Sequence, residues 1–309
     1  MSEFNYGGQA VIEGVMMRGS RGMAVAVRRP GGGIEVHSEP LTSRIYTTKW
    51  SRMPFVRGLA LLWDALGLGI RALLFSAEVS VEEEEDVEFS GAVAWGTVAI
   101  ALLLGIGIFF VLPLLIVGFL DRWIVSDLAS NLVEGVIRLA IFLAYIIVVG
   151  RMGDIRRVFS YHGAEHKTIN AYEDDAELTP ASVARYSTLH PRCGTGFLLV
   201  VMVVSILVFS LFGRPSLIPR IISRIVLIPV IAGISYEIIR FGAAHYGNRL
   251  VRTVLYPSLA LQRLTTNEPA LDMLEVAITA LKHVLAAEGL IEEKSPAEEP
   301  AIEEVPAIA

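Results

Sequence analysis

The sequence predicts a mainly α-helical, polytopic membrane protein, and its composition and its long apolar segments support this prediction. Apolar residues make up 53% of the 309 residues and charged residues only 19%, whereas soluble domains carry about 25% charge. The mean hydropathy of +0.56 agrees. We expect about four transmembrane helices, an interfacial amphipathic helix, a small N-terminal β unit and a C-terminal cytoplasmic helix. The lone cysteine, Cys193, excludes an intrachain disulfide framework, and the net charge of -6 gives no sign of a nucleic-acid partner.

Residues 1–50 form a Gly-rich segment that we expect to fold as a cytoplasmic β unit. Within it, residues 22–40 have the pattern of a hairpin. The first strand is expected over residues 23–29 and the second over residues 34–38, with a Pro-Gly-Gly-Gly turn between them.

Residues 51–88 contain an apolar segment whose charges recur every seven positions, followed by an acidic linker at 82–86. On a helix, Arg57, Asp64 and Arg71 would form one stripe, which suits a helix lying in the cytoplasmic membrane interface. A re-entrant helix would also suit this stripe, and a fifth membrane span is the alternative. It would place Asp64 and Arg71 in hydrocarbon at a cost of about 2.5–3.5 kcal/mol each.

Residues 89–150 and 194–240 each contain two apolar segments long enough to cross a bilayer, whose hydrocarbon core of about 30 Å needs about 20 helical residues. The four expected spans run from Phe89 to Leu120, from about Leu132 to Gly150, from Gly194 to Phe212 and from about Leu217 to Ile239.

Basic residues set the predicted orientation, because Lys and Arg are retained on the cytoplasmic side of a membrane. They are frequent in the N-terminal region and in the loop 151–193 between the second and third spans. The segment between the first two spans has only Arg122. We therefore expect the loop 151–193 and both termini to be cytoplasmic.

Two pairs of charges lie one helical turn apart near the outer ends of predicted spans, Glu134 with Arg138 and Arg220 with Arg224. Snorkelling to the membrane surface and pairing within each helix account for them. The alternative is a polar cavity between the second and fourth spans, lined by Arg138, Arg224 and Glu237.

The cytoplasmic loop 151–193 carries the sharpest chemical signal. We expect a helix there that Ser160 caps and that ends near Glu173. On that helix, two imidazoles and a carboxylate share one face. These three residues are His162, Glu165 and His166. Their H-x-x-E-H order is that of the inverted zinc peptidases, in which both histidines bind zinc and the Glu is the general base.

His190 and Cys193 lie in the same loop and extend the histidine pair to four nitrogen and sulfur ligands, at a spacing similar to that of tetrahedral zinc sites. Four protein ligands would make a zinc ion structural, whereas three would leave a position open for catalysis. Glu237 is a further candidate ligand from another helix. The alternatives are histidines that only form hydrogen bonds, and a Cys193 that is a small buried residue or a thiolate nucleophile at a helix N-terminus.

Residues 241–288 are expected to form a cytoplasmic helical region. One helix covers 256–264, and the last begins near Asn267 and Pro269 and carries an apolar stripe along the rest of this region. The acidic tail 289–309 is expected to be disordered.

Four sequence motifs together identify a resemblance to a known family. They are Gly7-Gly-Gln-Ala-Val-Ile-Glu-Gly-Val-Met-Met-Arg18, Tyr161-His-Gly-Ala-Glu-His-Lys167, His190-Pro-Arg-Cys-Gly-Thr195 and Leu261-Gln-Arg-Leu-Thr-Thr266. Over about residues 5 to 285, the chain resembles the YqhQ-like family of bacterial integral membrane proteins, a family of unknown function whose members are labelled predicted metal-dependent enzymes. The resemblance implies a multi-pass protein of the bacterial inner membrane with cytosolic polar parts.

The N-terminal motif of this family places Gln9, Glu13 and Arg18 in a Gly-rich strand on the cytoplasmic side. These side chains could fold over the His/Cys loop and complete a pocket there. The alternative is that they only organise the small β unit.

Two classes of function are compatible with these features. The first is a membrane-associated metal-dependent hydrolase, with zinc held by His162, His166 and either His190 or Cys193, and with Glu165 as general base. The second is a non-enzymatic factor in membrane-protein assembly or biogenesis, which binds a partner through its interfacial and C-terminal helices. Membrane lipids are expected partners in both classes, other membrane proteins in the second, and nucleic acid in neither. The sequence leaves the oligomeric state open.

Overall fold

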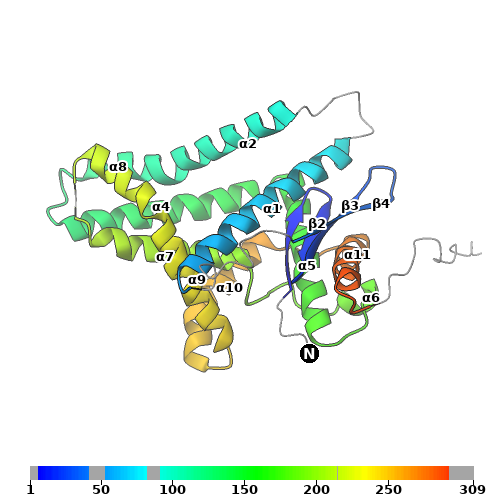
Figure 1. The fold of residues 1–309 in the computed structure, drawn as a ribbon. Coiled ribbons are helices and arrows are strands. Elements are labelled where there is room, and N and C mark those ends of the chain that lie inside the picture. Colours follow the sequence, from blue (N-terminus) through cyan, green and yellow to red (C-terminus); the bar gives the residue numbers. More distant parts are fainter. Residues whose placement is uncertain (1–5, 42–52, 82–90, 214, 292–309) are drawn as a thin grey trace, which may run out of the picture.

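The computed structural model describes residues 6–41, 53–81, 91–213 and 215–291. Long helices form one end of the molecule, and a small sheet with its covering helices forms the other (Figure 1). The acidic linker at 82–86 and the tail from residue 292 onward, for which we predicted a solvated linker and disorder, lie outside the described residues.

The N-terminal β unit is a four-stranded antiparallel meander with the strand order β1-β2-β3-β4. Its strands are β1 (Gly7–Val11), β2 (Gly14–Arg18), β3 (Gly22–Arg28) and β4 (Ile34–Pro40). The predicted hairpin is confirmed as β3 and β4, which pair from Gly22 with Pro40 to Arg28 with Ile34. Glu13, in the turn before β2, adopts a positive φ of 50°.

Both faces of this sheet are buried, which explains why β2 and β3 are apolar at nearly every position. Alternate residues point to opposite faces of a strand. Val15 and Ala26 belong to the core that the sheet shares with α5 (Gly153–Glu173) and α11 (Leu271–Ala287). Met16 and Val25 belong to the core on the other face, with Leu68, Ala72 and Val79 of α1 (Val56–Val81).

Helix α1 packs along the sheet, and its charged stripe faces the rest of the protein. Asp64 pairs with Arg18 of β2 at 3.2 Å, and Arg71 pairs with Glu39 of β4 at 3.2 Å. Trp63, by contrast, is 73% exposed. The side chains that would be costly in hydrocarbon are therefore paired with protein groups, and the interfacial position of α1 stays a prediction.

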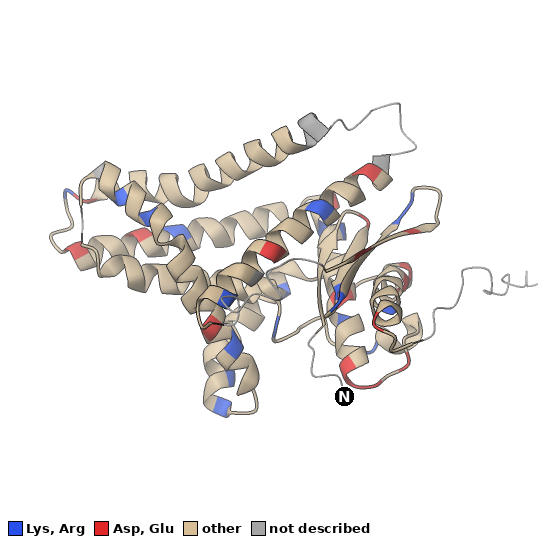
Figure 2. Ribbon diagram, in the orientation of Figure 1, with Lys and Arg blue, Asp and Glu red and all other residues tan. Residues whose placement is uncertain are grey.

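The described chain contains three helical segments that are long and apolar enough to cross a membrane: Val56–Ser80, Trp95–Leu120 and Asp127–Val149. The first lies in α1. The second combines α2 (Gly91–Ile106), the π-helix η3 (Gly107–Val111) and α3 (Leu112–Leu120), and the third is α4 (Asp127–Val149). Figure 2 shows that α2 carries no charged residue along its length.

The two later predicted spans are shorter or broken. Helix α7 (Gly194–Ser210) has 17 residues. Helices α8 (Leu217–Val226) and α9 (Ile228–Ala244) meet at a bend of 40° and count as a fourth candidate only if they form one broken span. Pro229, in the first turn of α9, lacks the backbone N–H that an unbroken helix would use there.

Several predicted helix ends need correction. Ser160 does not cap α5, which begins seven residues earlier at Gly153, and the Ser160 hydroxyl instead donates to the Arg156 carbonyl oxygen. The predicted end at Glu173 is confirmed. The helix expected over 256–264 is longer, α10 (Arg249–Thr265).

The final helix also begins later than predicted, because Ala270 rather than Asn267 precedes its first residue. Its apolar stripe is buried against the sheet and α5, with Leu274, Leu281 and Leu285 almost inaccessible. Leu271, which we counted in that stripe, is exposed. The β unit, α5 and α11 therefore form one compact polar unit at a single end of the molecule (Figure 1).

We predicted two separate pairs that extend toward the membrane surface, Glu134 with Arg138 and Arg220 with Arg224. The structure does not keep these pairs apart. All four lie in one buried cluster between α4 and α8. Of the three residues suggested to line a polar cavity, Arg138 and Arg224 meet in this cluster, whereas Glu237 lies apart and pairs with Arg57 of α1.

Candidate metal centre

Helix α5 presents His162 and His166 one turn apart on the face that looks toward the segment before α7. Their ring centroids are 4.4 Å apart. The Nδ1 atom of His162 lies 2.9 Å from the carbonyl oxygen of Thr265, and that of His166 lies 2.5 Å from the carbonyl oxygen of Thr188. A carbonyl oxygen only accepts, so each Nδ1 carries the proton and each Nε2 has a free lone pair. This is the arrangement of metal-binding histidines, whose second nitrogen donates to a backbone carbonyl.

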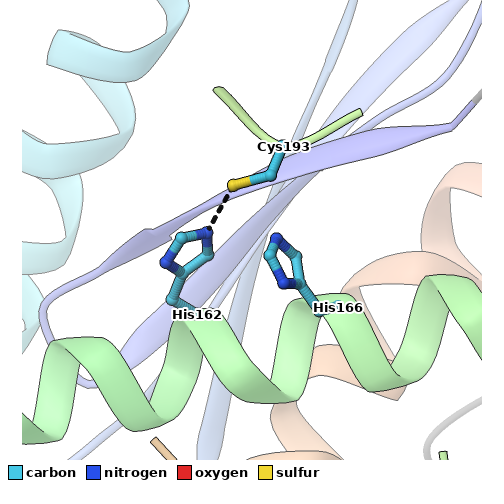
Figure 3. A group of neighbouring side chains, drawn as sticks. All are labelled: His162, His166 and Cys193. Atoms are coloured by element: carbon cyan, nitrogen blue, oxygen red, sulfur yellow. Dashed lines mark hydrogen bonds between the residues drawn. The ribbon is translucent and has the colours of Figure 1, made fainter. Parts of the chain in front are cut away.

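Cys193 brings a sulfur atom to the same point from the start of α7. It is the N-cap residue of that helix, and its Sγ accepts a hydrogen bond from the Thr195 backbone N–H. The Sγ atom lies 3.3 Å from Nε2 of His162 (Figure 3). One ligand atom from each of His162, His166 and Cys193 can be chosen so that all three lie within 4.8 Å of one another. The sequence motifs predicted this convergence.

The donor set fits a zinc ion. Neutral imidazole nitrogens and a cysteine sulfur are preferred zinc ligands, with bonds of about 2.0–2.1 Å to nitrogen and about 2.3 Å to sulfur. Ligand atoms around one ion must then lie roughly 3–4 Å apart, so the three side chains need only small adjustments. All three residues are largely shielded from solvent, with His166 1% and Cys193 7% exposed.

Glu165 is buried beside the two histidines, and in the part of the chain that the structure describes no Lys or Arg side chain pairs with it. Its Oε2 atom lies 3.6 Å from Nε2 of His166 and 3.9 Å from Nε2 of His162, too far for ordinary hydrogen bonds. The bases that could neutralise it have other partners, because Lys167 pairs with Glu268 and Arg192 with Glu173. The carboxylate therefore lies close to the Nε2 atoms of both histidines.

Gly8 of β1 provides room for this carboxylate. A Cβ atom at Gly8 would lie 2.8 Å from Cγ of Glu165 and 2.5 Å from the backbone oxygen of Met16. The N-terminal motif thus contributes to the site through the absence of a side chain. Gly7 has open space at the equivalent position.

The last turn of α10 also anchors the site. The Gln262 side chain bonds both backbone groups of His190, accepting from its N–H at 3.0 Å and donating to its carbonyl oxygen at 2.9 Å. The carbonyl of Thr265 orients His162. The motif at 261–266 therefore supports the His/Cys loop, a role that residue type alone did not indicate.

His190 lies next to the centre but is not one of the converging ligands. Its ring centroid is 5.7 Å from that of His166, and its Nε2 is 3.6 Å from a carboxylate oxygen of Glu173. Burial lowers the pKa of His190 below its usual value, against the opposing effect of Glu165, and so favours the neutral ring. The group that could hold a metal ion therefore includes Cys193 and leaves out His190.

The four residues predicted to form an additional pocket contact other parts of the protein instead. They are Gln9, Glu13, Arg18 and Glu237. Glu13 pairs with Arg157 of α5, Arg18 with Asp64 of α1, and Glu237 with Arg57. Gln9 packs on α1, where a Cβ at Gly69 would lie 2.3 Å from its Oε1. These residues join α1 and α5 to the sheet and to α9, as the alternative interpretation held for the β unit, and they do not line the metal centre.

Comparisons with known proteins place these features in a family. Residues 53–287 match the family described as "Protein of unknown function (DUF1385)". The chain is 33% identical over 300 residues to "Uncharacterized protein YqhQ" of Bacillus subtilis (strain 168), an alignment that covers 93% of this chain and 94% of the relative. No solved structure matches the chain. The family match includes all three converging ligands and Glu165.

Proposed function

This chain belongs to the DUF1385 family, in agreement with the YqhQ-like motifs of its sequence. From that premise and from the geometry of the site, we propose that it is a membrane-associated metal-dependent hydrolase. The observation that supports this most directly is the convergence of His162, His166 and Cys193 with the Glu165 carboxylate beside them. Zinc is the metal that this donor set favours.

The number of protein ligands supports a catalytic role. Structural zinc sites are closed by four protein ligands, whereas catalytic sites use three and keep one position open. In the described chain, the converging set contains three residues, and His190, whose backbone groups bond to Gln262, is not among them. When bound, zinc supplies a Lewis acid that makes a water molecule much more acidic near neutral pH.

Residues of this chain would orient the metal ligands and transfer the proton. The carbonyl groups of Thr188 and Thr265 fix both imidazole rings with Nε2 directed inward. Glu165 is free to take a proton from the attacking water and return it to the leaving group, because no basic side chain neutralises it. Its burial excludes bulk water from that transfer.

The position of the centre suggests a substrate near a membrane surface. One half of the site adjoins a candidate span, since α4 leads into α5, and the other half adjoins the shorter apolar helix α7, which Cys193 caps. We propose that the chain lies in the bacterial inner membrane with the sheet, α5 and α11 on the cytoplasmic side, as the distribution of Lys and Arg predicts. A peptide or a lipid headgroup at that surface would be within reach of the centre.

A biogenesis factor with a structural metal is the second candidate, and one observation favours it. Helix α1 exposes Trp63 and Leu66 on the side away from the sheet, a surface that a membrane-protein partner could cover. The C-terminal helix cannot contribute its apolar stripe to such a partner as we had expected, because that stripe is buried in the core of the polar unit.

The Glu165→Gln variant separates the two functions. For a hydrolase, zinc content and melting temperature should stay close to wild type, while complementation of a strain lacking the endogenous relative falls by a factor of about 100 or more. Glu173→Gln is the matched control, since Glu173 lies on the same helix but pairs with Arg192. Full complementation by a Glu165→Gln protein that keeps its zinc would rule out the hydrolase.

A further inference from the structure

A second cluster of charged side chains lies between α4 and α8, at the end of the molecule away from the sheet (Figure 2). Its centre is Glu134 of α4. Arg138 lies 2.6 Å from one carboxylate oxygen, while Arg220 and Arg224 lie 2.8 and 3.1 Å from the other. Asp121, after α3, pairs with Arg220 at 3.2 Å.

Burial makes the charge balance of this cluster important. The exposed fractions are 1% for Glu134, 4% for Arg138 and Arg220, and 2% for Arg224. Among the described residues, three guanidinium groups face two carboxylates, and one of these carboxylates, that of Asp121, is less deeply buried. An unbalanced buried charge is costly in protein and costlier in a bilayer. The described groups of the cluster therefore carry a net charge of +1, which one further anion would neutralise.

Buried hydrogen-bond donors without a partner among the described residues also indicate that the cluster can bind an anion. Within the described chain, Nε of Arg220 and Nη1 of Arg224 are buried and have no hydrogen-bond partner. A guanidinium group has only donors, so these nitrogens can be satisfied only by an acceptor. The two arginines lie one turn apart on α8, and both contact Glu134 on the same oxygen atom.

The surroundings hold the arginines in place. The Phe209 ring lies 4.1 Å from Cζ of Arg224 and 5.5 Å from Cζ of Arg138. Nε of Arg138 donates to the carbonyl oxygen of Phe109 at 3.0 Å, and Phe109 lies in the π-helix η3. π-helical turns often mark functional sites, and here the turn supplies an acceptor that keeps Arg138 in the cluster.

From these observations we propose that the Glu134–Arg138–Arg220–Arg224 cluster binds a phosphate group. Guanidinium groups match phosphate oxygens in geometry as well as charge, and one phosphate can accept from both open nitrogens. Helix α8 forms the outer wall of the site, with Ile218 and Ile222 exposed on its other face. Glu134 lies seven residues into α4, about 10 Å from the first residue of that helix. At this depth the site is close enough to the end of the helix for either a phospholipid headgroup or inorganic phosphate to reach it.

Binding can be measured on the full-length protein in a phosphate-free detergent. One arm titrates inorganic phosphate against sodium chloride at matched ionic strength and follows the melting temperature. The other counts by native mass spectrometry the lipids that remain bound after exposure to phosphatidylglycerol or to a glucosyl diacylglycerol, which has no phosphate. Saturable binding in the first arm assigns the site to inorganic phosphate, and selective retention of phosphatidylglycerol assigns it to a lipid.

Variants connect the binding to the cluster. Arg224→Gln should weaken the observed binding by about tenfold or more, as expected for loss of a charge-assisted hydrogen bond. Arg224→Lys should also weaken it, because the ammonium keeps the charge but lacks the planar fork. Arg122→Gln is the control, since Arg122 is exposed at the same end and stacks on Phe119 and Trp123.

Two results would overturn the proposal. One is equal stabilisation by phosphate and chloride together with no preference for phosphatidylglycerol. The other is binding that Arg224→Gln leaves unchanged. If Arg224→Gln fails to fold, Arg224→Lys, which keeps the charge, provides the comparison, and binding that Arg224→Lys leaves unchanged would overturn the proposal.

Discussion

Gly163 lies directly against the backbone of Asn267, and a Cβ atom at position 163 would come within 2.0 Å of the Asn267 carbonyl oxygen. The contact is reinforced by the Asn267 backbone N–H, which donates to the Phe159 carbonyl at 2.9 Å. A glycine between His162 and Glu165 weakens an isolated helix. Here it allows the segment after α10 to approach closely enough for Thr265 to orient His162.

Replacement of Gly163 by Ala should therefore damage the protein even though alanine favours helices. We expect a loss of about 1–3 kcal/mol of stability from overpacking, together with weaker zinc retention because His162 loses its anchor. Gly153→Ala is the control, since nothing lies within 4 Å of a Cβ there. Melting temperature and zinc stoichiometry in detergent test this. An unchanged Gly163→Ala protein would contradict the close contact.

The ligand assignment predicts that Cys193 and His190 differ in their effect on metal binding. Cys193→Ser should sharply reduce zinc retention and, in the cobalt-substituted protein, remove the absorption that a thiolate ligand produces. His190→Gln should keep both, because His190 is outside the converging set. Loss of metal from His190→Gln as complete as from Cys193→Ser would show that the ligand set is wrong.

Gly7 and Gly8 provide a matched pair for testing Glu165. Gly8→Ala should push the Glu165 side chain out of position and lower complementation more than zinc content. Gly7→Ala should have little effect, because a Cβ there meets open space. Equal effects of the two substitutions would indicate that Glu165 tolerates displacement.

Glu288 should contribute acid-sensitive stability. Its carboxylate accepts hydrogen bonds from the Tyr6 hydroxyl at 2.6 Å, the Ser20 hydroxyl at 2.8 Å and the Arg21 backbone N–H at 3.1 Å. Partial burial alone would raise the pKa of Glu288, but these donors outweigh it and hold the pKa below the ordinary value of 4.5. A depressed folded pKa stabilises the protein above the unfolded pKa, and the contribution is lost as the pH falls through the folded pKa.

Glu288→Gln should accordingly lower stability by about 1 kcal/mol at pH 7, a figure reduced for partial exposure, and by much less at pH 3. Melting temperatures across this range measure the difference. Glu275→Gln, which removes a half-exposed pair with Arg28, should change stability by less than about 0.5 kcal/mol. A Glu288→Gln deficit that persists at pH 3 would show that its charge is not responsible.

The proposed orientation can be tested by cysteine labelling in a Cys193→Ser background. Ser126→Cys, at the start of α4, should react with a membrane-impermeant maleimide in intact cells. Ser38→Cys, in β4, should react only after the membrane is permeabilised. The reverse pattern would invert the predicted topology.

The sequence predicted the elements that depend on local pattern. The β3–β4 hairpin followed from its turn residues, the end of α5 from the residues after Glu173, and the ligand face from the spacing of His162 and His166. These features need only neighbouring residues, whose periodicity and turn preferences are visible in one chain.

Features that depend on distant partners were not predictable in the same way. The pairing of Glu237 with Arg57 joins segments far apart in the sequence, and the same carboxylate could equally have faced a metal. Backbone carbonyls orient both histidines, and every residue has a carbonyl, so residue type could not single out Thr188 or Thr265. The motif at 261–266 was the one available signal.

The location of α11 has a consequence for how the protein assembles during synthesis. The strands β1 to β4 leave the ribosome before α5 and α11, which cover one face of their sheet. Chains emerge from the N-terminus and segments fold as their partners become available. The polar unit can therefore close only after the apolar helices between its parts have been synthesised. Until then the nascent chain exposes Val15, Met17 and Ala24, a surface that a chaperone or the insertion machinery would have to protect.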